Sequence, residues 1–165
     1  MQTEFASTTL QLTWRGVPYD GHILKILDTR KLPGITEYLI CRAWGDVAIA
    51  IKDMAVRGAP AIGAAGAFGM VLASEETETE DAIFLLRYLE TAADELLTTR
   101  PTAVNLFECL DRVMERARKT KTAAEIKEAV LDEAIAIARE DIVVNRAISA
   151  YGLGILPEGA CVLHH

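Results

Sequence analysis

The sequence predicts an α+β fold, in which a small N-terminal antiparallel β-meander over about residues 9–41 is followed by a helical bundle over about residues 44–155. The spacing of the apolar side chains supports this prediction. Their period is two up to about residue 41 and close to the helical 3.6 from Gly45 onward. The chain has 165 residues, of which 51% are hydrophobic and 25% are charged, and this suffices for one domain with its own core.

The strands of the meander are separated by turn-forming residues. Residues 9–14 and 22–27 favour β-structure, and the segment between them is rich in glycine, proline and aspartate, which is typical of a hairpin. Residues 36–41 form a third extended segment after the Pro33–Gly34 turn. We therefore expect an antiparallel sheet built from neighbouring segments of the chain.

Two helices are expected directly after the sheet. The first begins near Gly45, and the second, over about residues 60–74, begins at a proline, which suits the first helical position. Gly63, Gly66 and Gly69 lie three positions apart in this second helix. Another backbone can therefore approach one side of it closely.

The remainder of the predicted bundle contains three helices, at about residues 78–97, 99–118 and 124–150. Thr77 with Glu80, and Thr122 with Glu125, have the spacing of a capping box, which satisfies unpaired N–H groups at a helix start. Glycines at 152 and 154 are expected to end the last helix.

The last residues depart from the helical pattern. Pro157–Gly159 is a turn sequence, and Ala160–Leu163 is typical of the first residues of a buried strand. A single strand forms no sheet by itself. We therefore expect residues 1–157 to form an N-terminal domain, and residues 158–165 to be the first strand of a second domain that this chain lacks.

Composition excludes several functional classes. The formal net charge of −7 disfavours a nucleic-acid or acidic-lipid partner. The N-terminus lacks a secretory apolar segment, and the longest weakly polar run, residues 59–73, is shorter than the roughly 20 residues of a membrane span. Cys41, Cys109 and Cys161 are too few and too scattered for a disulfide framework. We expect a cytoplasmic protein without membrane or nucleic-acid partners.

Two similar helix starts are the strongest candidates for a binding site. Arg57, Gly58 and Ala59 precede Pro60, and Arg100 precedes another proline. A helix N-terminus presents unpaired N–H groups and a positive dipole end, and a guanidinium adds forked donors, so each start suits a phosphate or polyol. The alternative is that each arginine is a surface charge beside an ordinary proline-started helix.

Other candidate residues are weaker. His164 and His165 are adjacent, so in a strand they point to opposite faces, which disfavours a shared metal; no metal site is predicted. Cys109 and Cys161 fit inert core thiols, and His22 fits a half-exposed sheet residue.

A polar cluster in the last helix is explained by surface pairing at helical spacing; its members are Glu140, Asp141, Asn145 and Arg146. The motifs of serine hydrolases, phosphate-binding loops and zinc proteases do not occur. The residues therefore offer a candidate anion site and no complete catalytic set.

Four ordered blocks of the sequence resemble the N-terminal half of the 5-methylthioribose-1-phosphate isomerase family. They are LTWRG (12–16), LDTRKLPG (27–34), IKDMAVRGAPAIG (51–63) and TRPTAVNL (99–106). Residues 140–154 continue the resemblance, which covers essentially the whole chain.

The resemblance implies an aldose–ketose isomerase of methionine salvage that needs no cofactor and is a homodimer at full length. It assigns substrate contacts to Arg57, Gly58, Ala59 and Arg100. It implies that the missing second domain is Rossmann-like, and it places the catalytic cysteine and aspartate beyond His165. This chain is therefore expected to hold no catalytic residue and to be inactive alone. His164 stands where the family usually has threonine.

Two related families remain as alternatives. One comprises the regulatory or scaffold subunits of initiation factor 2B, which share the architecture and are expected to lack the substrate blocks. The other is ribose-1,5-bisphosphate isomerase, which also uses an Arg-Gly-Ala loop. The intact blocks favour an isomerase, and the Pro-Ala-Ile-Gly continuation at residues 60–63 favours the methylthioribose enzyme.

Overall fold

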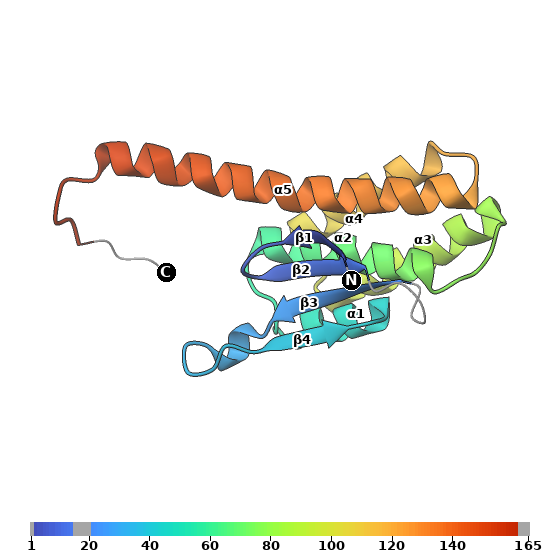
Figure 1. The fold of residues 1–165 in the computed structure, drawn as a ribbon, viewed down its shortest axis with the longest axis horizontal. Coiled ribbons are helices and arrows are strands. Elements are labelled where there is room, and N and C mark those ends of the chain that lie inside the picture. Colours follow the sequence, from blue (N-terminus) through green and yellow to red (C-terminus); the bar gives the residue numbers. More distant parts are fainter. Residues whose placement is uncertain (1, 15–20, 162–165) are drawn as a thin grey trace.

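The N-terminal part of the chain forms a four-stranded antiparallel sheet with strand order β1-β2-β3-β4 (Figure 1). This computed structural model describes residues 2–14 and 21–161. The strands are β1 (Gln2–Ala6), β2 (Leu10–Trp14), β3 (His22–Leu27) and β4 (Tyr38–Cys41). The predicted meander is therefore confirmed.

Strand β1 was not expected. It pairs with β2, with Phe5 opposite Leu12 and a register shift between Thr3 and Phe5. Phe5 is buried, and its ring centroid lies 5.4 Å from that of Phe68 in α2. This contact between distant residues, together with strand pairing, stabilises a segment whose own sequence carries little strand signal.

In the described part of the chain, five α-helices follow the sheet, as the fold class predicts. They are α1 (Trp44–Lys52), α2 (Ala59–Glu75), α3 (Ala82–Thr99), α4 (Val104–Arg118) and α5 (Ala123–Ile155), with a short 3-10 helix η1 (Thr29–Lys31) between β3 and β4. Helix α2 is buried from Ile62 to Ser74 and contacts all four other α-helices as well as β2 and β3. A helix that is apolar on all sides belongs at the centre of a core.

Another helix packs closely against the glycines of α2, as their spacing in the sequence predicts. Gly63 faces Asn105 and Cys109 of α4, and Gly66 faces Leu106 and Leu110 of the same helix. Because both contacts fall near the N-termini, α2 and α4 begin at the same end of the bundle.

The start of α3 and the end of α5 differ from expectation. Helix α3 begins at Ala82 because the Asp81 carboxylate accepts hydrogen bonds from the N–H groups of Ile83 and Phe84, at 2.9 and 3.2 Å, so the Thr77 start is wrong. Helix α5 begins with the predicted Thr122–Glu125 capping box. It then continues through both glycines to Ile155, since a glycine costs only about 1 kcal/mol in a helix.

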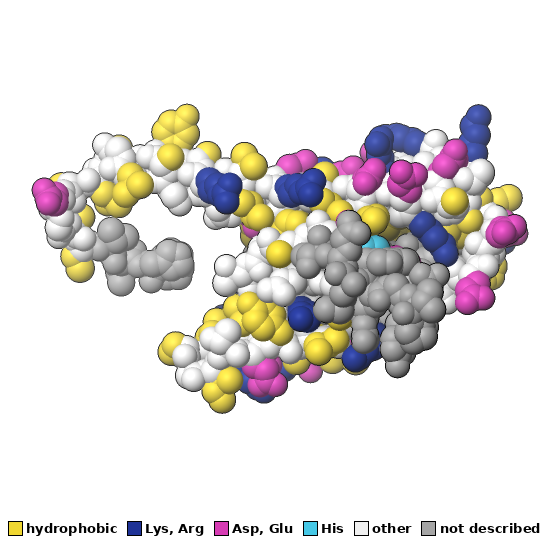
Figure 2. All heavy atoms as spheres, in the orientation of Figure 1, with side chains coloured by type: hydrophobic (Ala, Val, Ile, Leu, Met, Phe, Trp, Pro, Cys, Tyr) yellow, Lys and Arg dark blue, Asp and Glu magenta, His cyan; other side chains and the backbone are white. Residues whose placement is uncertain are grey.

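The second half of α5 projects beyond the bundle (Figure 1). Large apolar side chains are exposed along it, and Figure 2 shows them gathered over the projecting part; they include Val143, Val144, Ile148, Tyr151, Leu153 and Ile155.

The expected turn follows α5: Ala160 N–H donates to the Pro157 carbonyl at 3.1 Å. Ala160 and Cys161 are not in a strand, and the rest of the predicted strand, residues 162–165, lies outside the described residues. In the described parts of the chain, none of the helices combines the length and the apolar character needed to cross a membrane.

Candidate functional site

The start of α2 carries three of the four predicted contact residues. Gly58 is the N-cap residue, with φ of 95°, and its carbonyl accepts a hydrogen bond from Ile62 N–H at 2.9 Å. This positive φ favours glycine because it has no Cβ. Val56 is fully buried, whereas Arg57, Gly58 and Ala59 are exposed. The chain therefore turns from the core to the surface at Arg57.

The start of α4 is reached through a turn. Ala103 N–H donates to the Arg100 carbonyl at 2.9 Å, and the helix begins at Val104. Pro101 therefore lies in the turn and does not begin the helix as expected. A hollow of about 560 Å³ opens beside this turn, with Arg100, Thr102 and Phe107 in its lining.

The two helix starts lie at one end of the bundle. The contact of Gly63 with Asn105 joins the first turn and a half of α2 to the first turn of α4. The positive dipole ends of both helices therefore lie at this end of the bundle. Within residues 2–14 and 21–161, neither Arg57 nor Arg100 takes part in an ion pair. Both guanidinium groups retain their donors for a ligand.

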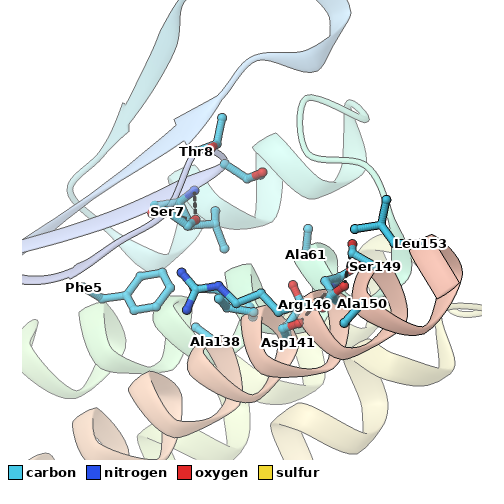
Figure 3. A pocket seen from close by; sticks show the side chains of 15 residues that line it. Phe5, Ser7, Thr8, Ala61, Ala138, Asp141, Arg146, Ser149, Ala150 and Leu153 are labelled. Atoms are coloured by element: carbon cyan, nitrogen blue, oxygen red, sulfur yellow. Dashed lines mark hydrogen bonds between the residues drawn. The ribbon is translucent and has the colours of Figure 1, made fainter. Parts of the chain in front are cut away.

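A cavity of about 610 Å³ adjoins the α2 start (Figure 3). Ala61 and Ala64 of α2 form one wall, the turn between β1 and β2 forms another, and the projecting half of α5 forms the third. The Arg146 side chain points into this cavity (Figure 3). Sequence reasoning missed the cavity because residues far apart in the chain build it.

The polar cluster on α5 divides into two groups. Asn145 Nδ2 donates to the Asp141 carboxylate at 2.8 Å, as helical surface pairing predicts. Glu140 instead pairs with Arg112 of α4 at 2.7 Å, and this hydrogen bond lowers the pKa of Glu140. The ion pair between Glu140 and Arg112 therefore fixes α5 against α4.

The remaining candidates show no catalytic grouping. His22 is buried rather than half-exposed, and its Nδ1 lies 2.5 Å from Glu75 Oε1. Burial raises the pKa of the Cys41 thiol to about 12 and also raises that of Cys109, so both thiols stay protonated. Cys161 is exposed, which contradicts its interpretation as a core thiol.

The candidate metal ligands give no site in the described chain. His164 and His165 lie outside the described residues. Among residues 2–14 and 21–161, no group of three or more His, Cys, Asp or Glu side chains is arranged to hold a metal ion.

The fold and the end of the bundle where α2 and α4 begin define the class of protein. It is an α+β domain with a four-stranded meander and five helices, in which an arginine precedes the start of each of these two helices. A family model described as the initiation factor 2 subunit family matches residues 55–165. The chain belongs to this family, and it is similar over most of its length to methylthioribose-1-phosphate isomerases.

The relatives include both isomerases and a translation factor. A methylthioribose-1-phosphate isomerase from Thermosipho africanus is 44% identical over 156 residues, which are 94% of this chain and 45% of that protein. The crystal structure of 5-methylthioribose 1-phosphate isomerase from Pyrococcus horikoshii superposes with a TM-score of 0.82 at 35% identity, covering 95% of this chain and 42% of that one.

A crystal structure from A. fulgidus, described as translation initiation factor eIF-2B subunit delta, has a TM-score of 0.80 at 44% identity and covers 92% of this chain and 43% of that one. The family resemblance and the fold class are thus confirmed. The chain spans less than half the length of these relatives.

Proposed function

We propose that the protein binds 5-methylthioribose 1-phosphate and forms the N-terminal part of the isomerase that converts it to 5-methylthioribulose 1-phosphate in methionine salvage. The observation that carries this proposal is the pairing of two helix starts, one following Arg57 and Gly58 and the other following Arg100, at one end of the bundle. The names of the relatives supply the substrate.

The proposed contacts follow from the chemistry of a phosphate ester. Arg57 and Arg100 each offer a planar fork of donors that matches phosphate or sugar oxygens. Gly58 has no side chain and is exposed, so the ligand can approach the backbone there. Ala59 lies at the first position of α2, where the dipole favours a negative charge.

These residues bind and orient the substrate but do not transfer protons. A 1-phosphate cannot open to a free aldehyde as an unsubstituted sugar does. An acid must assist ring opening, and a further group must move a hydrogen from C2 to C1. Arginine remains protonated near neutral pH and therefore suits neither step. As the resemblance to the isomerase family implies, we propose that a cysteine and an aspartate beyond His165 perform both steps. We propose that no cofactor takes part.

This proposal includes the assembly and the location of the protein. We infer a cytoplasmic homodimer at full length, with residues 1–157 as its N-terminal domain and residues 158–165 as the first strand of a second domain. The isolated chain is expected to bind substrate without turning it over.

A regulatory subunit similar to initiation factor 2B is the second candidate, and the similarity to the A. fulgidus structure favours it. A scaffold of this kind has no need to bind a sugar phosphate. Ribose-1,5-bisphosphate isomerase, the third candidate, differs in the phosphate at C5 of its substrate.

The test is a titration of the isotope-labelled chain with 5-methylthioribose 1-phosphate, ribose 1,5-bisphosphate and inorganic phosphate, followed by NMR. We expect the first compound to bind most tightly and to shift the Gly58 amide resonance. An isomerisation assay on the same sample should show no turnover. Tighter binding of the bisphosphate would favour the third candidate, and the absence of any sugar phosphate binding would favour the scaffold.

A further inference from the structure

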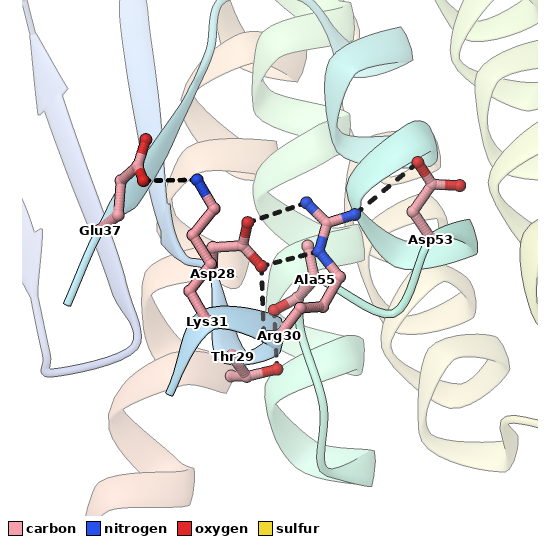
Figure 4. A network of polar contacts seen from close by, with 7 residues as sticks. All are labelled: Asp28, Thr29, Arg30, Lys31, Glu37, Asp53 and Ala55. Carbon is pink, nitrogen blue, oxygen red and sulfur yellow. Dashed lines mark hydrogen bonds and ion pairs between the residues drawn. The ribbon is translucent and has the colours of Figure 1, made fainter. Parts of the chain in front are cut away.

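The segment after β3 is attached to the loop that leads into α2 (Figure 4). Thr29, the first residue of η1, donates two hydrogen bonds to the Ala55 carbonyl, one from its backbone N–H and one from Oγ1, both at 2.9 Å. Ala55 lies in the middle of residues 53–58, which connect α1 to α2 and end at Gly58. A carbonyl with two donors from one residue has little freedom to reorient.

An ion pair between buried Asp28 and exposed Arg30 fixes the same segment. Asp28 is fully buried, and its two carboxylate oxygens accept from Arg30 Nε at 2.7 Å and from Arg30 Nη2 at 2.8 Å. Arg30 Nη1 lies 3.9 Å from Asp53 Oδ2, where the loop begins. A bidentate pair of this kind sets the orientation of both groups. The loop is therefore contacted at its start and at its middle.

The loop backbone adopts conformations that need such support. Met54 has φ of 57°, which a side chain with Cβ rarely adopts. Ala55 and Val56 are fully buried, and Ala55 N–H donates to the Ala50 carbonyl at 2.9 Å. Arg57 follows immediately and is exposed. The direction in which the chain leaves the core at Arg57 thus depends on the residues that precede it.

We propose that Asp28, Thr29 and Arg30 form a brace that holds residues 53–58 in the conformation that binds the sugar phosphate. This inference rests on the proposed function and deepens it, since it makes the three residues positioning residues for Arg57 and Gly58. A loop that is ordered before the ligand arrives loses less conformational entropy on binding. The Leu-Asp-Thr-Arg motif at residues 27–30 would thus position the binding loop without contacting the ligand itself.

The neighbouring ion pair provides a matched control. Lys31 belongs to the same short helix as Thr29 and Arg30, but its Nζ pairs with Glu37 at 2.5 Å, away from residues 53–58. Removing this ion pair alters a side-chain contact of η1 but leaves the hydrogen bonds of Asp28, Thr29 and Arg30 in place.

The experiment compares Thr29→Val, Thr29→Ser, Arg30→Lys and the control Lys31→Ala in the full chain. Thr29→Val removes the Oγ1 hydrogen bond and keeps the branched shape, whereas Thr29→Ser keeps the hydroxyl. Arg30→Lys keeps the positive charge but removes the planar guanidinium that donates to both Asp28 oxygens. Three quantities are measured well below the melting temperature: amide hydrogen exchange at residues 56–58 without ligand, the Kd for 5-methylthioribose 1-phosphate, and the fraction folded.

We expect Thr29→Val and Arg30→Lys to accelerate exchange at Arg57 and Gly58 and to raise the Kd about fivefold, which is the effect of losing one hydrogen bond. Thr29→Ser and Lys31→Ala should stay close to the unmodified chain, with all variants folded. Arg30→Lys keeps the test decisive if Thr29→Val does not fold.

Two results would contradict the proposed positioning role of the brace. If the unmodified chain binds the sugar phosphate and both brace variants bind it equally well, the positioning role is wrong while the proposed function stands. If the unmodified chain binds no sugar phosphate, the proposed function fails and the positioning role fails with it.

Discussion

Gly63 faces the Asn105 backbone so closely that a Cβ atom added to Gly63 would come to 2.9 Å from the Asn105 carbonyl oxygen and to 2.7 Å from Cys109 Sγ. Real Cβ contacts are essentially never this short. Asn105 is the second residue of α4. The absence of a side chain at Gly63 therefore sets the separation of the two helix starts that carry the proposed ligand contacts.

Gly63→Ala is expected to destabilise the protein by about 1–3 kcal/mol, because a backbone carbonyl cannot rotate away from the new methyl group and α4 must shift. The same shift should weaken binding of the sugar phosphate. Urea unfolding gives the change in free energy of unfolding, and the NMR titration gives the change in Kd.

Gly152→Ala is the matched control for that variant. Gly152 is also helical, but a Cβ atom added there would meet no heavy atom within 4 Å. Alanine should therefore stabilise the helix by up to about 1 kcal/mol. Equal effects of the two substitutions would contradict the close-approach argument for Gly63.

Arg57→Ala and Arg100→Ala are expected to raise the Kd for 5-methylthioribose 1-phosphate roughly 10- to 100-fold, the effect of losing a charge-assisted contact of about 1.5–3 kcal/mol. The melting temperature should change little because both guanidinium groups lie outside the described ion pairs. Lysine at either position should rescue binding only in part.

Arg116→Ala removes an equal charge from the exposed surface near the other end of α4. It should leave the Kd unchanged. A lower melting temperature with unchanged affinity in the Arg57 and Arg100 variants would mean that both arginines are ordinary surface charges.

The parts of the fold that sequence patterns predicted are those governed by local rules. Alternation predicted β2 and β3, proline at residue 60 predicted the start of α2, and Thr122 with Glu125 predicted the start of α5. Each signal lies within a few residues of the structure that it specifies. Gly63 also predicted a feature of the structure correctly, because the lack of a side chain indicates that another backbone lies close to it.

Local signals at Thr77, Pro101 and Gly152 misplaced helix boundaries by a few residues, whereas the features that were missed entirely depend on residues far apart in the chain. Strand β1 is stabilised through Phe5 by Phe68 of α2, and no local pattern reports such a contact. Thr29 and Ala55 are 26 positions apart, so the motif around Thr29 could be matched to a family without its role being predicted. The cavity beside Arg146 likewise needs β1, α2 and α5 together.

Thr122→Ala is expected to cost about 1 kcal/mol of unfolding free energy, because Thr122 Oγ1 accepts a hydrogen bond from Glu125 N–H at 3.2 Å at the start of α5. Thermal or urea unfolding measures this cost. Thr98→Ala serves as the control: Thr98 is exposed, and its hydroxyl only donates to the Glu95 carbonyl of its own helix. Its effect should stay within about 0.5 kcal/mol.

Asp28→Asn tests the ion pair between Asp28 and Arg30 through its pH dependence. Hydrogen bonds from Arg30 hold the pKa of Asp28 below its ordinary value of 3.8. The ionised carboxylate therefore stabilises the fold fully above that value, and the stabilisation is lost as the pH falls toward the lower pKa of the folded state. Asparagine cannot ionise, so the variant should be less stable than the unmodified protein by about 1–3 kcal/mol at pH 7.

The difference between the two proteins should then shrink when urea unfolding is repeated at successively lower pH below about 4. Glu125 and Glu140 also have lowered pKa values, and their acid titration reduces the stability of both proteins alike. Subtracting the two stability curves removes that shared contribution and leaves the part due to Asp28. A difference that stays constant from pH 7 to pH 3 would show that the Asp28 carboxylate acts through its shape and not through its charge.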